Sequence, residues 1–160
     1  MATTFTLATR ADISRLLQFM HEYYEFDHLV FDEGAARTAV EGMIGNDALG
    51  CIWLIHHAGE TVGYLVLTLG YSLEYGGRDA FIDEVYIRSS HRRKGIGTAA
   101  LMFAEDQCRS LGVRALHLEV ERANINAYGV YRKVGFIDHE RYMLTKQIAD
   151  NPADGSDSNR

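Results

Sequence analysis

A run of cations directly before two glycines is the part of this sequence whose residue types most clearly suggest chemistry. Arg92-Arg93-Lys94 continues into Gly95-Ile96-Gly97. The hydrophobic pattern predicts a strand over residues 80–87 before this run and a helix over residues 97–111 after it. Backbone amides beside glycine, the positive end of a helix dipole and charged side-chain donors all attract phosphate groups. We therefore predict that this loop binds a phosphorylated ligand.

Two familiar nucleotide-binding patterns are alternatives for this loop. Residues 95–100 match the G-x-G-x-x-A of dinucleotide-binding folds, and Glu119 lies where a ribose-binding carboxylate is expected. Against this, seven residues, 88–94, separate the strand from the first glycine, whereas the dinucleotide turn is tight. The Walker pattern requires Gly-Lys-Ser/Thr, which does not follow the loop. A different phosphate-bearing cofactor is therefore favoured.

The same loop resembles a known cofactor-binding motif. Arg92, Gly95 and Gly97 match the Gln/Arg-x-x-Gly-x-Gly/Ala signature with which the GNAT N-acetyltransferase superfamily binds acetyl-CoA. Residues 124–136 are similar to the second motif of that superfamily, N-x-x-A-x-x-x-Y-x-x-x-G-F. The two motifs occur in the expected order, and together with the predicted elements the resemblance spans about residues 5–146.

This resemblance implies that acetyl-CoA is the co-substrate. In the superfamily the strand before the loop splays from its neighbour at a bulge, its free backbone pairs with the pantetheine arm, and one amide polarises the thioester carbonyl. Asn124 is similar to a residue that contacts the CoA arm. The residues that the resemblance places against the cofactor are Val85, Tyr86, Ile87, Arg92, Arg93, Lys94, Gly95, Ile96, Gly97, Thr98 and Asn124.

An acetyl acceptor needs a base. A free alkylamine has a pKa near 10.4, so on the order of one molecule in a thousand is unprotonated at pH 7. Asp83 and Glu84 lie on the strand beside the expected thioester, where the superfamily often has a carboxylate. Because strand alternation predicts that their side chains point to opposite faces, we expect one of them to serve, and we favour Glu84.

The leaving thiolate needs an acid. Tyr131 matches the tyrosine that is commonly given this role in the superfamily. It also lies on an apolar helical stripe with Ala127, Val130 and Val134, so the alternative is a tyrosine that packs in the core, and the two roles are compatible.

The elements that must position these groups form a mixed α/β domain. We predict a GNAT-like central sheet flanked by helices, with a splayed strand pair forming the acetyl-CoA cleft. The predicted strands cover residues 5–7, 51–56, 61–69, 80–87, 114–120 and 142–145. The predicted helices are one opened by a capping box at Thr9 to Asp12 and those over residues 33–44, 97–111 and 124–134.

Composition indicates one ordinary domain. The chain has 160 residues, 47% hydrophobic and 24% charged, and a formal charge of −6, which argues against non-specific nucleic-acid binding. We expect a single domain over residues 1–148 and a disordered acidic tail over residues 149–160. Two cysteines, no signal peptide and no membrane-length apolar run predict a cytoplasmic protein without a membrane partner. His56 and His57 have no partners at ligand spacing, so no metal is expected.

The acceptor is less clearly encoded. Acidic and aromatic residues alternate in the first two helices and before the strand over residues 80–87, which suits a small cationic, polyamine-like amine through ion pairing and cation–π contact. A loose similarity to diamine and polyamine acetyltransferases supports this. A protein-lysine or N-terminal acetyltransferase, or a non-catalytic acyl-CoA sensor, are the alternatives, and a homodimer is compatible with the resemblance. The residues concerned are Glu22, Tyr23, Tyr24, Glu25, Phe26, Asp27, Phe31, Asp32, Glu33, Tyr71, Glu74 and Tyr75.

Overall fold

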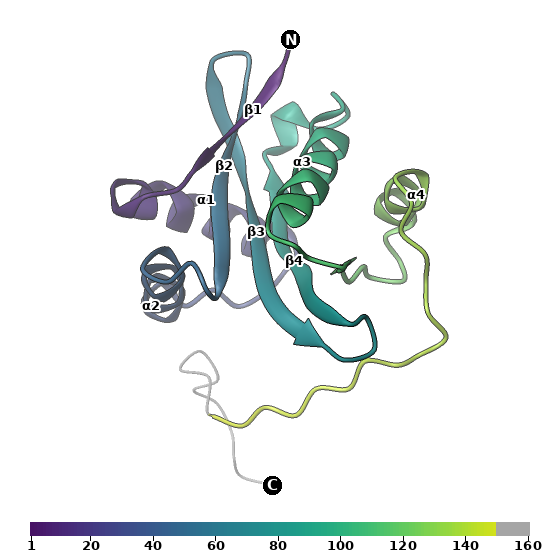
Figure 1. Ribbon diagram of the computed structural model, residues 1–160. Coiled ribbons are helices and arrows are strands. Elements are labelled where there is room, and N and C mark those ends of the chain that lie inside the picture. Colours follow the sequence, from purple (N-terminus) through teal and green to yellow (C-terminus); the bar gives the residue numbers. More distant parts are fainter. Residues whose placement is uncertain (150–160) are drawn as a thin grey trace, which may run out of the picture.

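A computed structural model describes residues 1–149, and its centre is a five-stranded sheet in the order β1-β2-β3-β4-β5 (Figure 1). The first four strands pair antiparallel, and β5 pairs parallel to β4. Helix α3 makes the crossover that a parallel pair requires. The strands are β1 Thr3–Leu7, β2 Gly50–His57, β3 Glu60–Ser72, β4 Gly77–Ile87 and β5 Ala115–His117. The expected mixed α/β fold is thereby confirmed.

Four α-helices flank the sheet, and two short 3-10 turns precede α1 and α3. The helices are α1 Ile13–Phe26, α2 Glu33–Ile44, α3 Ile96–Ser110 and α4 Ile125–Lys133, and the turns are η1 Arg10–Asp12 and η2 Ser89–His91. Within the capping box, the backbone N–H of Thr9 donates to Asp12 Oδ2 at 2.9 Å. The predicted helices agree with these bounds to within about one residue, because each carries a clear apolar stripe.

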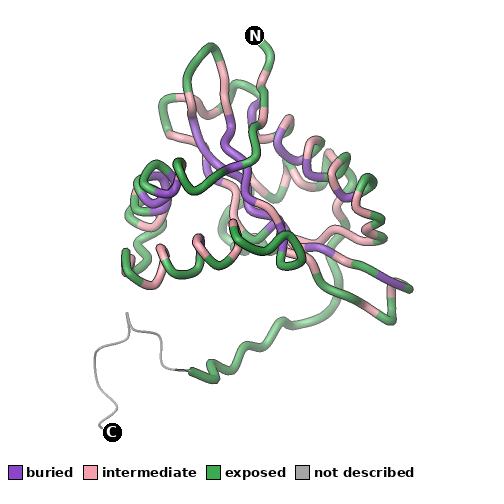
Figure 2. Tube along the Cα trace, turned by 60° about the vertical axis from the view of Figure 1, so that its left-hand side comes forward, coloured by how far each residue is buried: buried purple, intermediate pink, exposed green. Residues whose placement is uncertain are grey.

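Two apolar clusters cover the two faces of the sheet. On one face, α1 and α2 pack on side chains that include Leu54 and Tyr64. On the other face, α3 packs on side chains that include Leu65 and Ile82. Buried residues therefore follow the central strands and the inner sides of the helices (Figure 2).

A bulge in β4 changes which face its side chains reach. Val66 pairs with Glu84 but the next residue, Leu67, pairs with Ile82, so Asp83 is an extra residue in β4. Ile82 and Val85 consequently both belong to the α3 face, although three positions separate them. The expectation that Asp83 and Glu84 point to opposite faces is wrong, because the bulge resets the alternation between them.

Strands β4 and β5 separate soon after they meet. Their pairing covers only residues 79–81 of β4, opposite Ala115–His117. From residue 82 onward, β4 has a strand partner on its β3 side alone within residues 1–149. This divergence is the splayed pair that was expected, and it also explains why β5 is shorter than the predicted strand over residues 114–120.

The predicted last strand over residues 142–145 is wrong. Residues 136–149 form neither helix nor strand, and the chain leaves α4 as an extended, exposed segment (Figures 1 and 2). A strand requires backbone hydrogen bonds to a neighbouring strand, and this segment pairs with no strand among the described residues. The expected tail lies outside the described residues from position 150 onward.

No helix in residues 1–149 is long and apolar enough to span a membrane.

Candidate active site

The predicted anion-binding loop joins β4 to α3. Gly95 precedes the first residue of α3 and has a φ of 78°, a left-handed conformation that strains residues with a side chain. Gly97 lies in the first turn, and a Cβ built there meets only Ile87 Cδ1, at an ordinary 3.8 Å. The first-turn amides of α3 have no partners within the helix, so they can meet an anion, and nothing in the protein itself requires Gly97 to lack a side chain.

The three cations of this loop have different surroundings. Arg92 is tied down, because its Nε donates to the carbonyl oxygen of Ile87 at 2.9 Å and its guanidinium lies 4.1 Å from the centre of the Phe26 ring. Arg93 and Lys94 are exposed at the tip of the loop. The structure therefore gives the Arg92 side chain a role in joining the loop to α1, whereas Arg93 and Lys94 remain accessible to a phosphate.

The open edge of β4 begins beside the two carboxylates. The pairing with β5 ends at Phe81, and Asp83 and Glu84 follow at the bulge. Backbone groups of residues 82–87 that face away from β3 have no strand partner in the described part of the chain, so an extended ligand can pair with them. Tyr86 packs on the α1 face, while Val85 and Ile87 pack on the α3 face.

A cavity of about 280 Å³ lies on the α1 face, and both carboxylates line it. Its walls come from α1, α2 and the three central strands. The two oxygens of Glu84 each accept a hydrogen bond from a tyrosine of this pocket: Tyr24 donates to Oε1 at 3.4 Å and Tyr64 donates to Oε2 at 3.3 Å. Glu84 is thus half-buried but fully partnered.

The pocket changes the acidity of its carboxyl groups. Burial, assisted by the nearby charge of Asp83, raises the pKa of Glu84 to about 7, while the two tyrosine hydroxyls oppose this shift. Burial also raises the pKa of Asp83, although Asp83 lies at the exposed rim. A carboxyl group whose pKa lies near neutrality can both take up and release a proton under ordinary conditions.

Comparison with known proteins agrees with this geometry. A sequence profile described as the acetyltransferase (GNAT) family matches residues 13–136. This chain belongs to the GNAT acetyltransferase family. The resemblance drawn from the two motifs is thereby confirmed, and the protein is an acetyl-CoA-dependent N-acetyltransferase.

Individual relatives extend this picture. The acetyltransferase is 28% identical over 136 residues to thialysine N-epsilon-acetyltransferase of Mus musculus, which covers 79% of this chain and 78% of the mouse protein. It is 29% identical over 108 residues to streptothricin acetyltransferase of Streptomyces lavendulae, covering 67% of this chain and 55% of that protein.

Solved structures share the fold over most of the chain. An integron cassette protein from the mobile metagenome of Cole Harbour Salt Marsh superimposes with a TM-score of 0.83 at 38% identity and covers 93% of each chain. An acetyltransferase structure with acetyl-CoA from Clostridium acetobutylicum has the same fold, with a TM-score of 0.76, 16% identity and coverage of 91% and 96%.

The residues of the second motif lie on the other side of the sheet. Tyr131 of α4 is half-buried against the α3-face cluster, which also includes Val85 and Ile87, and burial raises its pKa. Glu84 lies on the α1 face, so the fold does not bring Tyr131 and Glu84 into one cluster. Asn124 caps α4 through its side chain, which accepts from the N–H of Ala127 at 3.1 Å. This capping role is a structural reason for an asparagine there.

Several acids that suggested a polycationic substrate already have partners in the acetyltransferase. Glu22 forms a two-point pair with Arg88, with a shortest distance of 2.8 Å, and this hydrogen-bonded pair lowers the pKa of Glu22. Glu74 forms a similar pair with Arg141 at 2.9 Å. Asp32 caps α2 by accepting from the N–H of Ala35 at 2.9 Å. These three carboxylates are therefore engaged by groups of the protein outside the pocket's β4 wall, whereas the partners of Glu84 are the two tyrosine hydroxyls of the pocket.

The tyrosine pair around Glu84 was not predicted from the sequence. Tyr24 was expected only as a substrate-wall aromatic, and Tyr64 attracted no functional interpretation. Cross-strand reasoning could have found Tyr64. Strand β3 pairs with β4, Val66 lies directly opposite Glu84, and Tyr64 lies two residues from Val66 on the same face.

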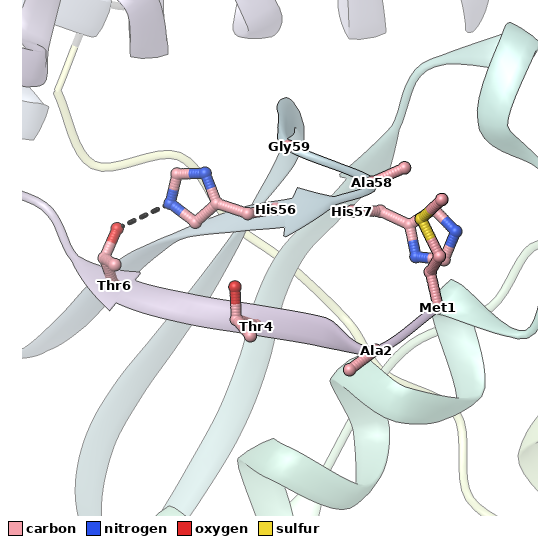
Figure 3. A pocket seen from close by; sticks show the side chains of 8 residues that line it. All are labelled: Met1, Ala2, Thr4, Thr6, His56, His57, Ala58 and Gly59. Carbon is pink, nitrogen blue, oxygen red and sulfur yellow. Dashed lines mark hydrogen bonds between the residues drawn. The ribbon is translucent and has the colours of Figure 1, made fainter.

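A second hollow, of about 650 Å³, lies between the start of β1 and the β2–β3 turn (Figure 3). Both histidines of this hollow are hydrogen-bonded to threonines of β1. His56 Nε2 lies 2.7 Å from Thr6 Oγ1, and His57 Nδ1 lies 3.1 Å from Thr3 Oγ1. No residue of β4, α1 or α2 lines this hollow. Within residues 1–149, no group of three or more potential ligand side chains is placed to hold a metal ion.

Proposed function

We propose that this acetyltransferase transfers an acetyl group to a small cationic primary amine by direct attack in a ternary complex. The amine would lie in the pocket between α1, α2 and the sheet, and acetyl-CoA along the open edge of β4. The observation that carries this proposal is the position of Glu84, which lines the pocket and belongs to the strand segment where β4 leaves β5.

Glu84 is the base in this proposal. A bound ammonium group loses a proton to the Glu84 carboxylate, and the free nitrogen lone pair then forms a bond to the acetyl carbon while the bond from that carbon to sulfur breaks. The nitrogen loses a second proton as the amide forms, and this proton replaces the one that the departing sulfur takes up. Acetyl-CoA supplies the activated acetyl thioester. A base with a pKa of about 7 is half ionised near neutral pH, which suits this proton transfer.

The cofactor side uses the loop and the strand edge. First-turn amides of α3, together with Arg93 and Lys94, would hold the pyrophosphate, while Arg92 keeps the loop against Phe26. Free backbone groups of residues 82–87 would pair with the pantetheine arm. Tyr131 is the proposed donor of a proton to the departing sulfur, and Asn124 contributes by fixing the start of α4.

Direct attack is favoured over an acyl-enzyme route because neither cysteine is activated. Burial raises the pKa of Cys108 to about 11, and burial together with the charge of Asp47 raises that of Cys51. Both thiols are therefore protonated at neutral pH and are poor nucleophiles. Free cysteines also fit the reducing cytoplasm, where we place the protein.

Known relatives support an amine acceptor. The mouse and Streptomyces relatives are named for acting on thialysine and streptothricin, and a further relative, from Pseudomonas aeruginosa, for methionine sulfoximine and methionine sulfone. The pocket volume of about 280 Å³ favours such small molecules over a folded protein.

We also propose that the chain forms a homodimer. Large apolar side chains are exposed along the segment after α4, including Tyr142, Leu144 and Ile148 at 82%, 89% and 90% exposure. The outer side of β5 has no strand beside it within residues 1–149. A second copy of the chain would cover both features.

The test is an initial-rate measurement of CoA thiol release with acetyl-CoA and amine varied independently. A ternary complex predicts double-reciprocal lines that intersect. Parallel lines would indicate an acetylated enzyme intermediate. If acetyl-CoA binds but no amine and no lysine peptide causes release of the CoA thiol, the protein is an acyl-CoA sensor.

A further inference from the structure

The walls of the acceptor pocket are mainly apolar. Leu16 and Met20 come from α1, Val40 and Met43 from α2, and Ile52 and Val66 from the sheet. Val40 and Ile52 are each only 5% exposed. A substrate body that contacts these side chains must be apolar, because burying a polar group against them without a hydrogen bond is unfavourable.

Two of the three carboxylates that line the pocket lie on one strand. Asp83 and Glu84 are adjacent in β4. The third, Asp32, accepts from the N–H of Ala35, so the positive end of the α2 dipole partly offsets its charge. One ammonium group can therefore be paired with the two carboxylates of β4, whereas a second ammonium several carbon atoms away would find, apart from Asp32, a wall that is mainly methionine, leucine and valine.

The loop that borders the pocket adds two apolar side chains to its wall. Residues 27–32 connect α1 to α2, and Val30 and Phe31 of this loop line the cavity. Leu29 and Val30 are 52% and 72% exposed. A substrate that passes this loop thus meets exposed apolar side chains beside Asp32 before it reaches the carboxylates of β4.

We infer that the preferred acceptor is a primary monoamine with an apolar body, an unbranched alkyl chain or a single aromatic ring, and not a diamine or polyamine. This inference rests on the proposed function and narrows its acceptor. The cavity of about 280 Å³ lies at the lower end of the range for small-molecule sites, so the body has the size of one ring or a short chain.

Matched amines test this directly. Thiol release is measured with propylamine, butylamine, pentylamine, hexylamine and 2-phenylethylamine, and with 1,4-diaminobutane, 1,6-diaminohexane and spermidine. Each added methylene should raise kcat/KM about threefold to fourfold until the pocket is filled. Hexylamine should exceed 1,6-diaminohexane, which differs by the second amine alone, at least tenfold.

A variant provides an independent measurement. Ala39 is exposed on α2 and lines the pocket, so Ala39→Glu adds a carboxylate to the apolar wall without disturbing the core. The ratio of kcat/KM for 1,6-diaminohexane to that for hexylamine should rise at least tenfold. The control is Thr38→Glu, at the neighbouring exposed position outside the pocket lining, which should leave this ratio unchanged.

The outcomes separate the two proposals. If diamines or spermidine are acetylated as well as or better than the monoamines, the inference is overturned and the proposed function stands. If a lysine peptide is the best acceptor, the inference and the small-amine acceptor of the proposed function both fail. An unchanged diamine ratio in Ala39→Glu would also overturn it. If no amine of any kind releases thiol from acetyl-CoA, the proposed function itself fails.

Discussion

Glu84 is held between opposing influences. Removal from water and the neighbouring charge of Asp83 raise its pKa, while hydrogen bonds from Tyr24 and Tyr64 lower it. The balance near 7 decides when the carboxylate can accept a proton from an amine. Each of these groups can be changed separately, and each change shifts the pH dependence in a defined direction.

Tyr64→Phe should shift the acid limb of the kcat/KM profile to higher pH. The hydroxyl donates to the charged carboxylate, so its loss favours the protonated form and raises the pKa of Glu84. Activity requires the ionised form, which then appears only at higher pH. The measurement is kcat/KM between about pH 5.5 and 9. Tyr71→Phe, at a tyrosine that is 75% exposed, is the control. A limb that stays in place or moves to lower pH would show that Tyr64 does not tune Glu84.

Tyr131→Phe should lower turnover at least tenfold, because general acids contribute on the order of 10²-fold or more. Acetyl-CoA affinity should change much less, since the thiolate develops only as the reaction proceeds. The ring keeps its contacts with the α3-face cluster, so the melting temperature should stay within a few degrees. Calorimetry and thiol release give these quantities. Normal turnover would make Tyr131 a packing residue, and a joint loss of stability and cofactor affinity would make its hydroxyl structural.

At the scale of elements, the bulge in β4 is the feature that assembles the site. It brings Asp83 and Glu84 to one pocket and places them where β4 leaves β5. Asp83→Asn should therefore move the acid limb to lower pH, because it removes the like charge that raises the pKa of Glu84. The profile is measured as for Tyr64→Phe, and the shift has the opposite sign. If the limb does not move, the two carboxylates do not interact across the pocket.

Gly97→Val should weaken acetyl-CoA binding at least tenfold, about 1.4 kcal/mol, because a branched side chain obstructs the approach of a phosphate to the first turn of α3. The protein itself has room at this position, so the melting temperature should change little. Gly42→Val is the control, since nothing lies within 4 Å of a Cβ at this glycine of α2. Unchanged calorimetric affinity in folded Gly97→Val would remove this loop from the cofactor site.

The sequence predicted most of the individual helices and strands, but it did not predict the contacts between them. Apolar periodicity located the helices, and two motifs pointed to the candidate cofactor loop and to α4, because both signals are local. The bulge at Asp83 depends on pairing with β3, which a single strand does not encode. Likewise, the contact of Arg92 with Phe26 and the tyrosine pair on Glu84 depend on residues brought together only by the fold.

At the scale of the whole molecule, the exposed segment after α4 predicts association. Light scattering should give twice the 18.0 kDa chain mass for the protein, and half of that value for the double variant Leu144→Asp with Ile148→Asp. Both side chains are almost fully exposed, so their removal from a dimer interface would disturb nothing within one chain. Lys146→Asp, an exposed position in the same segment, should leave the dimer intact. A wild-type mass of a single chain would refute the homodimer.

The proposed reaction depends on a proton passing from the amine in the α1-face pocket to Glu84. The most direct test is the pH profile of kcat/KM for the best amine, in wild type and in Glu84→Gln. Wild type should rise through a limb near pH 7, and the variant should lack this limb. The decrease in kcat/KM of the variant should be largest at neutral pH and smallest at about pH 9–10, where more of the ammonium group loses its proton to solvent without a base. A uniform loss at all pH values, or the same limb in both proteins, would contradict the role of Glu84. If the limb instead disappears in Asp83→Asn, the base is Asp83.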